Sequence, residues 1–312
     1  MTDKGTQYEH QPVMLDEVLD MWFSRSDGFY VDGTFGRGGH SRALLAKLDA
    51  DGRLTGIDRD PLAIAEGEAL ADEDRRFHIK ASRFDCLQDV VAEQGRPIDG
   101  LLLDLGVSSP QLDDAARGFS FLRDGPLDMR MDPTSGESAA DWLARAEEKE
   151  IADVLYRYGE ERKSRWIAKR ICETRKEQPI TRTLQLADLI ESVLGRSEPG
   201  KHPATRSFQA LRIHINGELD ALNKVLEQSL ETLAIGGRLA IISFHSLEDR
   251  IVKLFIRDHS GRAPKGRGGL PLGDEMPQRL EPVGKAIRAS KAELKVNVRS
   301  RSAVLRVAEK VA

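Results

Sequence analysis

The chain has 312 residues, of which 31% are charged and 40% hydrophobic, and its formal net charge is -4. These values are typical of a globular protein with room for more than one domain, and they exclude a small basic nucleic-acid module, so any RNA contact must use local patches. The two cysteines form no C-x-x-C motif, so the sequence predicts neither a disulfide framework nor a zinc site. No metal is expected. The N-terminus lacks an apolar signal region and no run of residues is long enough to cross a membrane, which predicts a cytoplasmic protein without a membrane partner.

A helix and a glycine-rich turn are predicted first along the chain. Apolar residues recur at helical spacing over residues 8–23, and the following stretch, FYVDGTFGRGGHS, predicts a short strand, a glycine turn and the start of a helix. Glycines let the main chain approach a ligand closely, and a helix N-terminus offers backbone N–H groups. The turn fits neither the dinucleotide fingerprint nor the phosphate loop, but Asp32, Gly36 and Gly38 fit acidic-x-x-x-Gly-x-Gly. That pattern resembles the first motif of S-adenosylmethionine-dependent methyltransferases, and an ordinary strand–helix turn is the alternative.

Two further strands are predicted to end near this turn. The strand at 52–58 ends in Asp58, 20 positions beyond Gly38. An acid at this strand end can accept hydrogen bonds from a ribose diol, and the alternative is a helix N-cap. After a strand at 76–81, Phe84 begins a helix and has two interpretations: a contact with an adenine ring, or a place in the core.

The fourth predicted strand, residues 98–106, contains a continuous apolar run. Such a run is expected of a strand that is covered on both faces of a sheet. The strand leads to Asp104, and a carboxylate at the end of a buried strand is costly unless it is paired or functional. We therefore expect a functional role for Asp104.

The regular alternation of strands and helices stops at residues 113–135, which predict a long ordered loop. Apolar side chains within this loop argue against disorder, and the arginines among them suit base stacking and phosphate contact. The alternative is that the apolar side chains only anchor the loop. The residues in question are Phe119, Phe121, Met129 and Met131, with Arg117, Arg123 and Arg130.

Helices alone are predicted between about 137 and 195, and a helical block inside an α/β alternation indicates an inserted domain. A basic run in this block is either a nucleic-acid face or a solvated helix face. The run consists of Arg162, Lys163, Arg165, Lys169, Arg170, Arg175 and Lys176.

The α/β pattern then resumes. We expect an amphipathic helix over 207–234 with an interruption at Gly217, a fifth strand over 236–245, and a helix that Ser246 caps with Asp249 at its third position. Residues 260–284 are rich in glycine and proline and predict a mobile loop. The tail after them predicts two short strands and is strongly basic, with Lys285, Arg288, Lys291, Lys295, Arg299 and Arg301.

Taken together, these segments resemble the bacterial small-subunit (16S) ribosomal RNA cytosine N(4)-methyltransferases, the RsmH or MraW family. The stretches that carry the resemblance run over nearly the whole chain, and they include HQPVMLDEV, DGTFGRGGHS, GIDRDP, LLLDLGVSSPQLDDAARGFSF, DGPLDMRMD, HPATRSFQALRI, ISFHSLEDRIVK and RSRSAVLR. The resemblance implies a class I methyltransferase fold, α/β and Rossmann-like with a mostly parallel sheet. We expect the methyltransferase domain at 1–112 and 206–312 and a helical substrate-recognition insert at 113–205.

Carried over by position, the resemblance implies a cofactor site and a catalytic site. The cofactor site would contain Gly38, Gly39, His40, Asp58, Phe84, Asp104 and Gln111. The catalytic residues would be Asp104, Ser109 and Pro110, with His245 or Asp104 assisting the loss of a proton. The loop after the fourth strand lacks the aromatic residue that amino-methyltransferases use for base stacking, so Phe119, Phe121 and Phe244 are the substitutes.

The activity that the resemblance implies is methyl transfer from S-adenosylmethionine to a cytidine N(4) amine in ribosomal RNA, within the small subunit. The base must be single-stranded or flipped, because an amine inside a helix is inaccessible. One alternative is a methyltransferase for another nucleic acid, a protein or a small molecule. Another is a non-catalytic cofactor-binding protein. The oligomeric state stays open.

Overall fold

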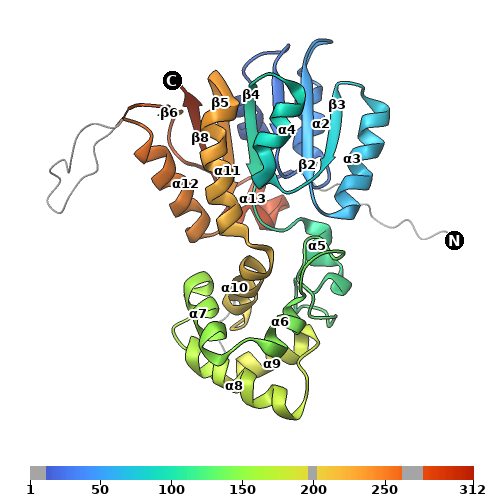
Figure 1. Cartoon of the computed structure of the whole chain (residues 1–312), viewed down its shortest axis with the longest axis vertical. Helices are drawn as coiled ribbons and strands as arrows, with labels where there is room; N and C mark the ends of the chain where they lie inside the picture. The colour runs from blue at the N-terminus through green and yellow to red at the C-terminus, as the bar shows by residue number, and fades with distance from the viewer. Residues whose placement is uncertain (1–11, 196–201, 262–276) are drawn as a thin grey trace, which may run out of the picture. The chain divides into compact units, whose positions relative to one another are not determined.

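The computed structural model describes residues 12–195, 202–261 and 277–312, which form two compact units (Figure 1). The sheet unit contains Met1–Gly106 and Ala221–Ala312, and the helical unit contains Val107–Asp220. The helical unit therefore extends further in both directions than the expected insert, 113–205. The physical reason is packing: the helix at Thr205–Asn216 buries Phe208 and Leu211 in the core of the helical unit.

The sheet unit is built on one mixed sheet with the order β3-β2-β1-β4-β5-β8-β6, and β7 pairs with β8. The strands β3, β2, β1, β4 and β5 run parallel, and β8 is antiparallel to β5, β6 and β7. This arrangement confirms the expected α/β fold with a mostly parallel sheet. The bounds are β1 Phe29–Asp32, β2 Arg53–Asp58, β3 Phe77–Ala81, β4 Ile98–Asp104, β5 Leu233–Ser243, β6 Leu280–Pro282, β7 Ile287–Arg288 and β8 Val304–Lys310.

Helices cover both faces of this sheet, because successive residues of a strand point to opposite faces. Leu101 and Leu103 of β4 share a core with α4, α11 and α12, whereas Leu102 faces the core formed with α1, α2 and α3. The apolar run of β4, residues 101–103, is accordingly buried on both faces of the sheet, as its sequence predicted. The bounds are α1 Leu15–Trp22, α2 Gly39–Leu45, α3 Pro61–Glu73, α4 Leu87–Gln94, α11 Glu218–Thr232 and α12 Ser246–Asp258.

The helical unit has its own core, to which α6 to α10 all contribute buried side chains. Its helices are α5 Ser109–Asp113, α6 Ala139–Arg145, α7 Glu148–Gly159, α8 Ser164–Glu177, α9 Thr183–Leu194 and α10 Thr205–Asn216. Gly217, in a left-handed conformation with φ 60°, separates α10 from α11, which is the interruption that the sequence predicted.

The irregular segment of the helical unit is anchored by the side chains that the sequence offered for RNA contact. Phe119 and Met129 are buried in its core. Arg130 forms a two-pronged pair with Asp128, at 2.7 and 2.8 Å, and Arg117 donates to the carbonyl of Met131 at 2.8 Å. Anchoring, the alternative interpretation, is therefore the role that these contacts give the segment.

Two segments complete the described chain. The tail folds into a short helix, α13 Glu293–Val296, and a 3-10 turn, Val298–Ser302, and the strands β7 and β8 flank them. Most of the predicted mobile loop, 262–276, lies outside the described residues. Within the described part of the chain, no helix is long and apolar enough to cross a bilayer.

Candidate cofactor and catalytic site

The glycine turn after β1 is held in place by a buried acid. Asp32, which is 1% exposed, accepts hydrogen bonds from Ser41 Oγ at 2.7 Å and from the Thr34 N–H at 3.2 Å. Burial raises the pKa of Asp32 to about 6, and the charge of Asp58 acts in the same direction. Asp32, the acid of the sequence motif, thus stabilises the turn through hydrogen bonds in the protein interior.

The glycines of the turn are required by backbone conformation at Gly36, by crowding at Gly39 and by both at Gly38. Gly36 and Gly38 have φ values of 57° and 71°, in the left-handed region that favours glycine. A Cβ on Gly38 would lie 2.6 Å from the ring of Phe35, and one on Gly39 would lie 2.3 Å from Pro12. The backbone of this turn is therefore fixed by close packing as well as by its sequence.

Asp58, at the end of β2, is tied directly to the glycine turn. Its Oδ2 accepts from the Gly36 N–H at 2.8 Å, and its Oδ1 accepts from the N–H groups of Arg59 at 2.7 Å and Asp60 at 2.9 Å. Burial raises the pKa of Asp58, while these backbone hydrogen bonds oppose the shift. The capping of α3, the alternative role for Asp58, belongs to Asp60, whose side chain accepts from the Leu62 N–H at 3.0 Å.

Asp104, at the end of β4, has no lysine or arginine paired with its carboxylate among the described residues. Its side chain is 26% exposed, but its Oδ1 is buried and has no hydrogen-bond partner among the described residues. Its Oδ2 lies 3.9 Å from Nδ1 of His40. Burial, followed by the charges of Asp32 and Glu248, raises the pKa of Asp104 to about 8.

His40 supplies no positive charge to this carboxylate near neutral pH, because burial lowers the pKa of His40 to about 4. Its Nε2 lies 3.0 Å from the Val13 carbonyl, so Nε2 carries the hydrogen and the lone pair of Nδ1 faces Asp104. The sequence itself offered no reason to choose His40, which was implied only by the family resemblance.

Phe84 lies beside the glycine turn and is partly buried against the core below it. A Cβ on Gly33 would come within 3.4 Å of the Phe84 Cβ and 2.6 Å of the Leu103 side chain. The structure therefore places Phe84 at the carboxyl edge of the sheet, where Asp104 also donates its N–H to Thr34 Oγ1 at 2.6 Å. The ends of β1, β2 and β4 thus meet around one turn, as expected for ligand sites of open α/β sheets.

Ser109, Pro110 and Gln111 belong to the helical unit and form the first turn of α5. Gln111 Oε1 accepts from the Ser108 N–H at 2.9 Å, and the two residues form a reciprocal capping box. Gln111 therefore orders the Ser108–Pro110 main chain, a contact that the sequence analysis did not predict.

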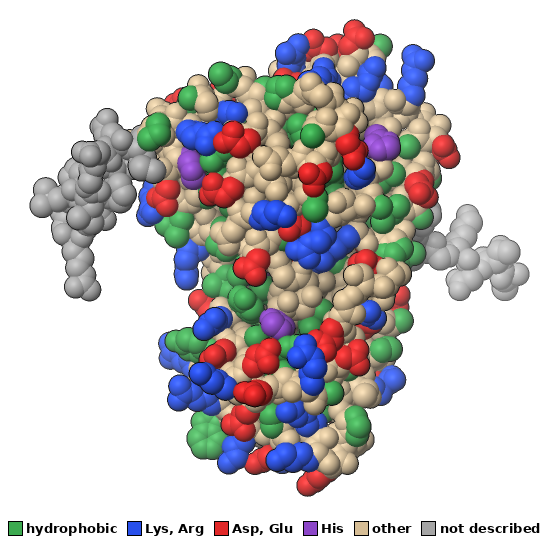
Figure 2. Space-filling view, in the orientation of Figure 1, with side chains coloured by type: hydrophobic (Ala, Val, Ile, Leu, Met, Phe, Trp, Pro, Cys, Tyr) green, Lys and Arg blue, Asp and Glu red, His purple; other side chains and the backbone are tan. Residues whose placement is uncertain are grey.

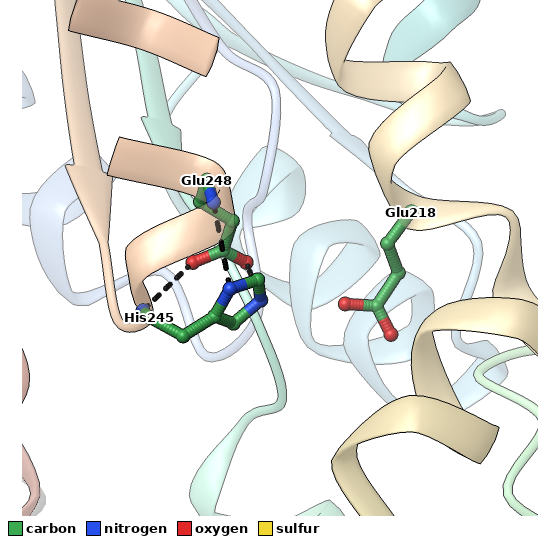
Figure 3. A group of neighbouring side chains, drawn as sticks. All are labelled: Glu218, His245 and Glu248. Atoms are coloured by element: carbon green, nitrogen blue, oxygen red, sulfur yellow. Dashed lines mark hydrogen bonds and ion pairs between the residues drawn. The ribbon is translucent and has the colours of Figure 1, made fainter. Parts of the chain in front are cut away.

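His245 is the N-cap of α12, so the expectation that Ser246 caps this helix is wrong (Figure 3). The N–H of Glu248 donates to His245 Nδ1 at 3.4 Å, and Glu248 Oε2 accepts from the N–H groups of Phe244 at 2.8 Å and His245 at 3.2 Å. Glu248 Oε1 also lies 3.0 Å from His245 Nε2, at an angle that makes no hydrogen bond. The cap moves one residue upstream because the extended backbone of His245, φ -140° and ψ 164°, precedes the first helical residue.

Glu248 is the site residue that the sequence analysis missed. It is 2% exposed, and its charge contributes to the raised pKa of Asp104. The signal was present, because a histidine followed three positions later by a glutamate satisfies the spacing of a capping box. Asp249, the residue chosen instead, forms a two-pronged pair with Arg306, at 2.7 and 3.1 Å.

The three aromatic candidates for base stacking are placed differently. Phe119 is 7% exposed in the core of the helical unit, and Phe121 packs edge-on against Phe208, with 4.7 Å between ring centroids. Phe244 is partly buried against the core of the sheet unit. Phe119 is therefore the least accessible of the three.

Comparisons with known proteins point to one family. Residues 7–311 match the family model described as the MraW methylase family. The chain is 86% identical to the ribosomal RNA small subunit methyltransferase H of Alcanivorax borkumensis, over 100% of both chains. It is 55% identical to the protein of the same name from Chromohalobacter salexigens, over 99% of this chain and 94% of that one. For the Thioalkalivibrio sulfidiphilus protein of that name the identity is 58%, over 97% and 98%.

Proposed function

Since the chain belongs to the MraW methylase family, we propose that it methylates the N(4) amine of a cytidine in small-subunit ribosomal RNA. It is a methyltransferase, and its methyl donor is S-adenosylmethionine. The RNA substrate is supported by the names of relatives that match the whole chain at up to 86% identity. The choice of the cytidine amine rests on the family resemblance of the sequence.

The residues at the glycine turn fit this cofactor. The orphaned Oδ1 of Asp104 is the observation that carries the assignment, because a buried acceptor without a donor requires a ligand donor to offset its desolvation. The ammonium of the amino-acid end of S-adenosylmethionine is such a donor. The Asp58 carboxylate has roughly four lone-pair positions, and three of them accept hydrogen bonds from backbone N–H groups. The remaining position, on Oδ2, is available to a ribose hydroxyl.

Gly38, Gly39, His40 and Phe84 would complete the cofactor site. The two glycines keep side chains out of the turn, and Phe84 at the sheet edge offers an apolar ring for the adenine. His40 would act on the site through Asp104, since its Nδ1 faces that carboxylate at 3.9 Å. Gln111 would contribute by fixing the loop of Ser108.

The cofactor, when bound, supplies an electrophilic methyl group on a sulfonium. The protein must hold the cytosine amine in line with that methyl, at about 3–3.5 Å, because the amine lone pair is delocalised into the ring. Acceptors that bind the amine hydrogens turn the lone pair toward the methyl. In the sheet unit, Asp104 is the group that we assign to this role, and the family resemblance adds the main chain of Ser109 and Pro110.

In this proposal, Asp104 accepts the proton that the amine loses. The pKa of about 8 belongs to the cofactor-free protein, and the ammonium of the bound cofactor beside Oδ1 lowers the pKa of Asp104 and keeps the carboxylate ionised as a proton acceptor. His245 is less suited, because its Nδ1 lone pair receives the Glu248 N–H and its Nε2 then carries hydrogen. A role for His245 as proton acceptor would require that capping bond to break.

Methyl transfer from labelled S-adenosylmethionine to three acceptors tests the proposal: naked 16S RNA, assembled small subunits and a protein extract. We expect label in N(4)-methylcytidine after nuclease digestion of one of the two RNA samples, and none with Asp104→Asn at saturating cofactor. Label in protein alone, or cofactor binding without transfer to any acceptor, would reject the RNA assignment. The same experiment decides whether the small subunit, the partner that we propose, is preferred to free RNA.

A further inference from the structure

An exposed tryptophan stands out on the helical unit. The chain has three tryptophans: Trp22 and Trp142 are 0% and 2% exposed, whereas Trp166 is 68% exposed near the start of α8. Among the described residues, no ring is paired with its indole and no cation lies over it. The ring is therefore open to a ligand, and burying it would remove a large apolar surface from water.

Cations occupy the positions around this indole. Residues three or four apart are neighbours on a helix surface, and Trp166 has Lys163 before it and Lys169 and Arg170 after it at these spacings. The buried positions of α8, such as Ile167 and Ile171, lie on the other side of the helix. One exposed face of α8 thus combines the indole with the basic residues.

Exposed basic residues outnumber exposed acids in and just before α8. Across 162–177 the exposed positions hold two acids, Glu173 and Glu177, and six basic residues: Arg162, Lys163, Arg165, Lys169, Arg170 and Lys176. Glu173 reaches Lys169 and Arg170 only at 3.9 and 4.0 Å, and exposed pairs of this kind contribute little. Within the described chain, the side chains of Arg162, Lys163 and Arg165 have no acidic partner. Figure 2 shows Lys and Arg side chains, with acids among them, on the visible face of the helical unit.

We propose that the face of α8 around Trp166 is a binding site for an unpaired segment of the RNA substrate, with a base stacked on the indole. The inference rests on the proposed function and adds to it the place where the RNA is held. An aromatic ring among cations matches the two features of single-stranded nucleic acid: a flat base and a charged backbone. A protein or a membrane surface would match the apolar ring, but the excess of positive charge favours the polyanion.

Direct binding measurements test the site. We would titrate the protein with a labelled single-stranded fragment of 16S RNA and with a blunt duplex of equal charge, following anisotropy and, separately, tryptophan fluorescence. Stacking should quench the exposed indole with the single strand and not with the duplex. Trp166→Ala should weaken binding of the single strand by about 5- to 150-fold, the range for loss of one base–aromatic stack, and Trp166→Phe should keep most of the affinity.

Tyr156→Ala is the matched control. Tyr156 is 62% exposed on α7 of the same unit, but the residues three before and four after it are Asp153 and Glu160. This variant should bind RNA like the wild type. Charge reversal at Lys169 and Arg170 should lower the salt dependence of binding by about 0.7 per lost phosphate contact.

Several outcomes would overturn the inference. Wild-type affinity in folded Trp166→Ala would do so while leaving the methylation of RNA, tested separately, intact. Equal loss of affinity in Tyr156→Ala would show that any exposed aromatic residue matters, and a fluorescence shift with anionic vesicles but not with RNA would assign the face to a membrane. Cofactor affinity, measured by calorimetry, should be the same in all variants.

Discussion

At the scale of single residues, Asp104 has an environment that disfavours its ionised form. It is close to two other buried acids and to a neutral histidine, so its anionic form receives no counter-charge from the described residues. The pKa of this carboxyl group is about 8 in the folded protein and about 4 in the unfolded chain. Between these pH values the folded protein holds a proton that the unfolded chain releases. Stability of the cofactor-free protein should therefore fall as pH rises from about 4 to about 8, and no further above that.

Asp104→Asn should remove this part of the pH dependence. We would follow thermal unfolding from pH 5 to 9 without cofactor. The difference between the melting temperatures of the variant and the wild type should increase up to about pH 8 and stay constant above it. Asp74→Asn is the control, because the hydrogen bond from Arg76 lowers the pKa of Asp74 and that residue is ionised throughout the range. Parallel curves for wild type and Asp104→Asn would show that Asp104 is ionised in the free protein.

Asp58 allows a sharper test than truncation, because removal of its carboxylate would leave three backbone N–H groups without acceptors. Asp58→Asn keeps one acceptor oxygen, which can serve the N–H groups of Arg59 and Asp60, and removes the charge together with the acceptor for the Gly36 N–H. We expect S-adenosylmethionine to bind less tightly by about 1.5–3 kcal/mol, the contribution of a charge-assisted hydrogen bond. Calorimetry should show unchanged affinity for Asp60→Asn, since asparagine caps a helix as well as aspartate does.

At the scale of elements, the turn between β1 and α2 depends on glycine for two separable reasons. Gly38 and Gly95 both have left-handed backbones, with φ 71° and 65°. Of the two, only Gly38 is crowded: a Cβ added there would meet the ring of Phe35, whereas a Cβ added to Gly95 would meet nothing within 4 Å. A substitution at Gly95 would therefore cause conformational strain alone, whereas a substitution at Gly38 would cause both strain and crowding.

Gly95→Ala should lower the free energy of unfolding by about 1–2 kcal/mol, the cost of a left-handed non-glycine residue. Gly38→Ala should lower it by a further 1–3 kcal/mol or so, because Phe35 must move, and it should also weaken cofactor binding. Urea unfolding of both variants measures the difference. Equal effects at the two positions would mean that Phe35 gives way without strain.

At the scale of the whole molecule, the helical unit is one continuous stretch with its own core, whereas the sheet unit needs two stretches of chain. We expect a fragment of residues 107–220 to fold alone, with helical circular dichroism and a cooperative thermal transition. The matched fragment is 113–205, the range that the sequence predicted, which lacks Phe208 and Leu211. Loss of each buried side chain costs roughly 1.5–3 kcal/mol, against a total stability of about 5–15 kcal/mol, so the shorter fragment should be much less stable or unfolded.

The elements and their order could be predicted from the sequence, because hydrophobic periodicity and glycine turns are local signals. The glycine cluster after β1, the acid Asp58 that ends β2 and the apolar run before Asp104 identified the three strand ends that meet at the site. The family motifs then implied His40 and Gln111, for which periodicity offered no reason.

The pairing of these side chains could be read only from the folded chain, because burial and hydrogen bonding depend on residues that are distant in the sequence. The fold assigned the cap of α3 to Asp60 rather than Asp58, and it tied Asp58 to Gly36, 22 positions away. It also brought Glu248 near enough to Asp104 to raise the pKa of that carboxyl group, although the two lie on different elements. Electrostatic coupling of this kind leaves no local pattern, since it arises from the shared low-dielectric interior and not from spacing along the chain.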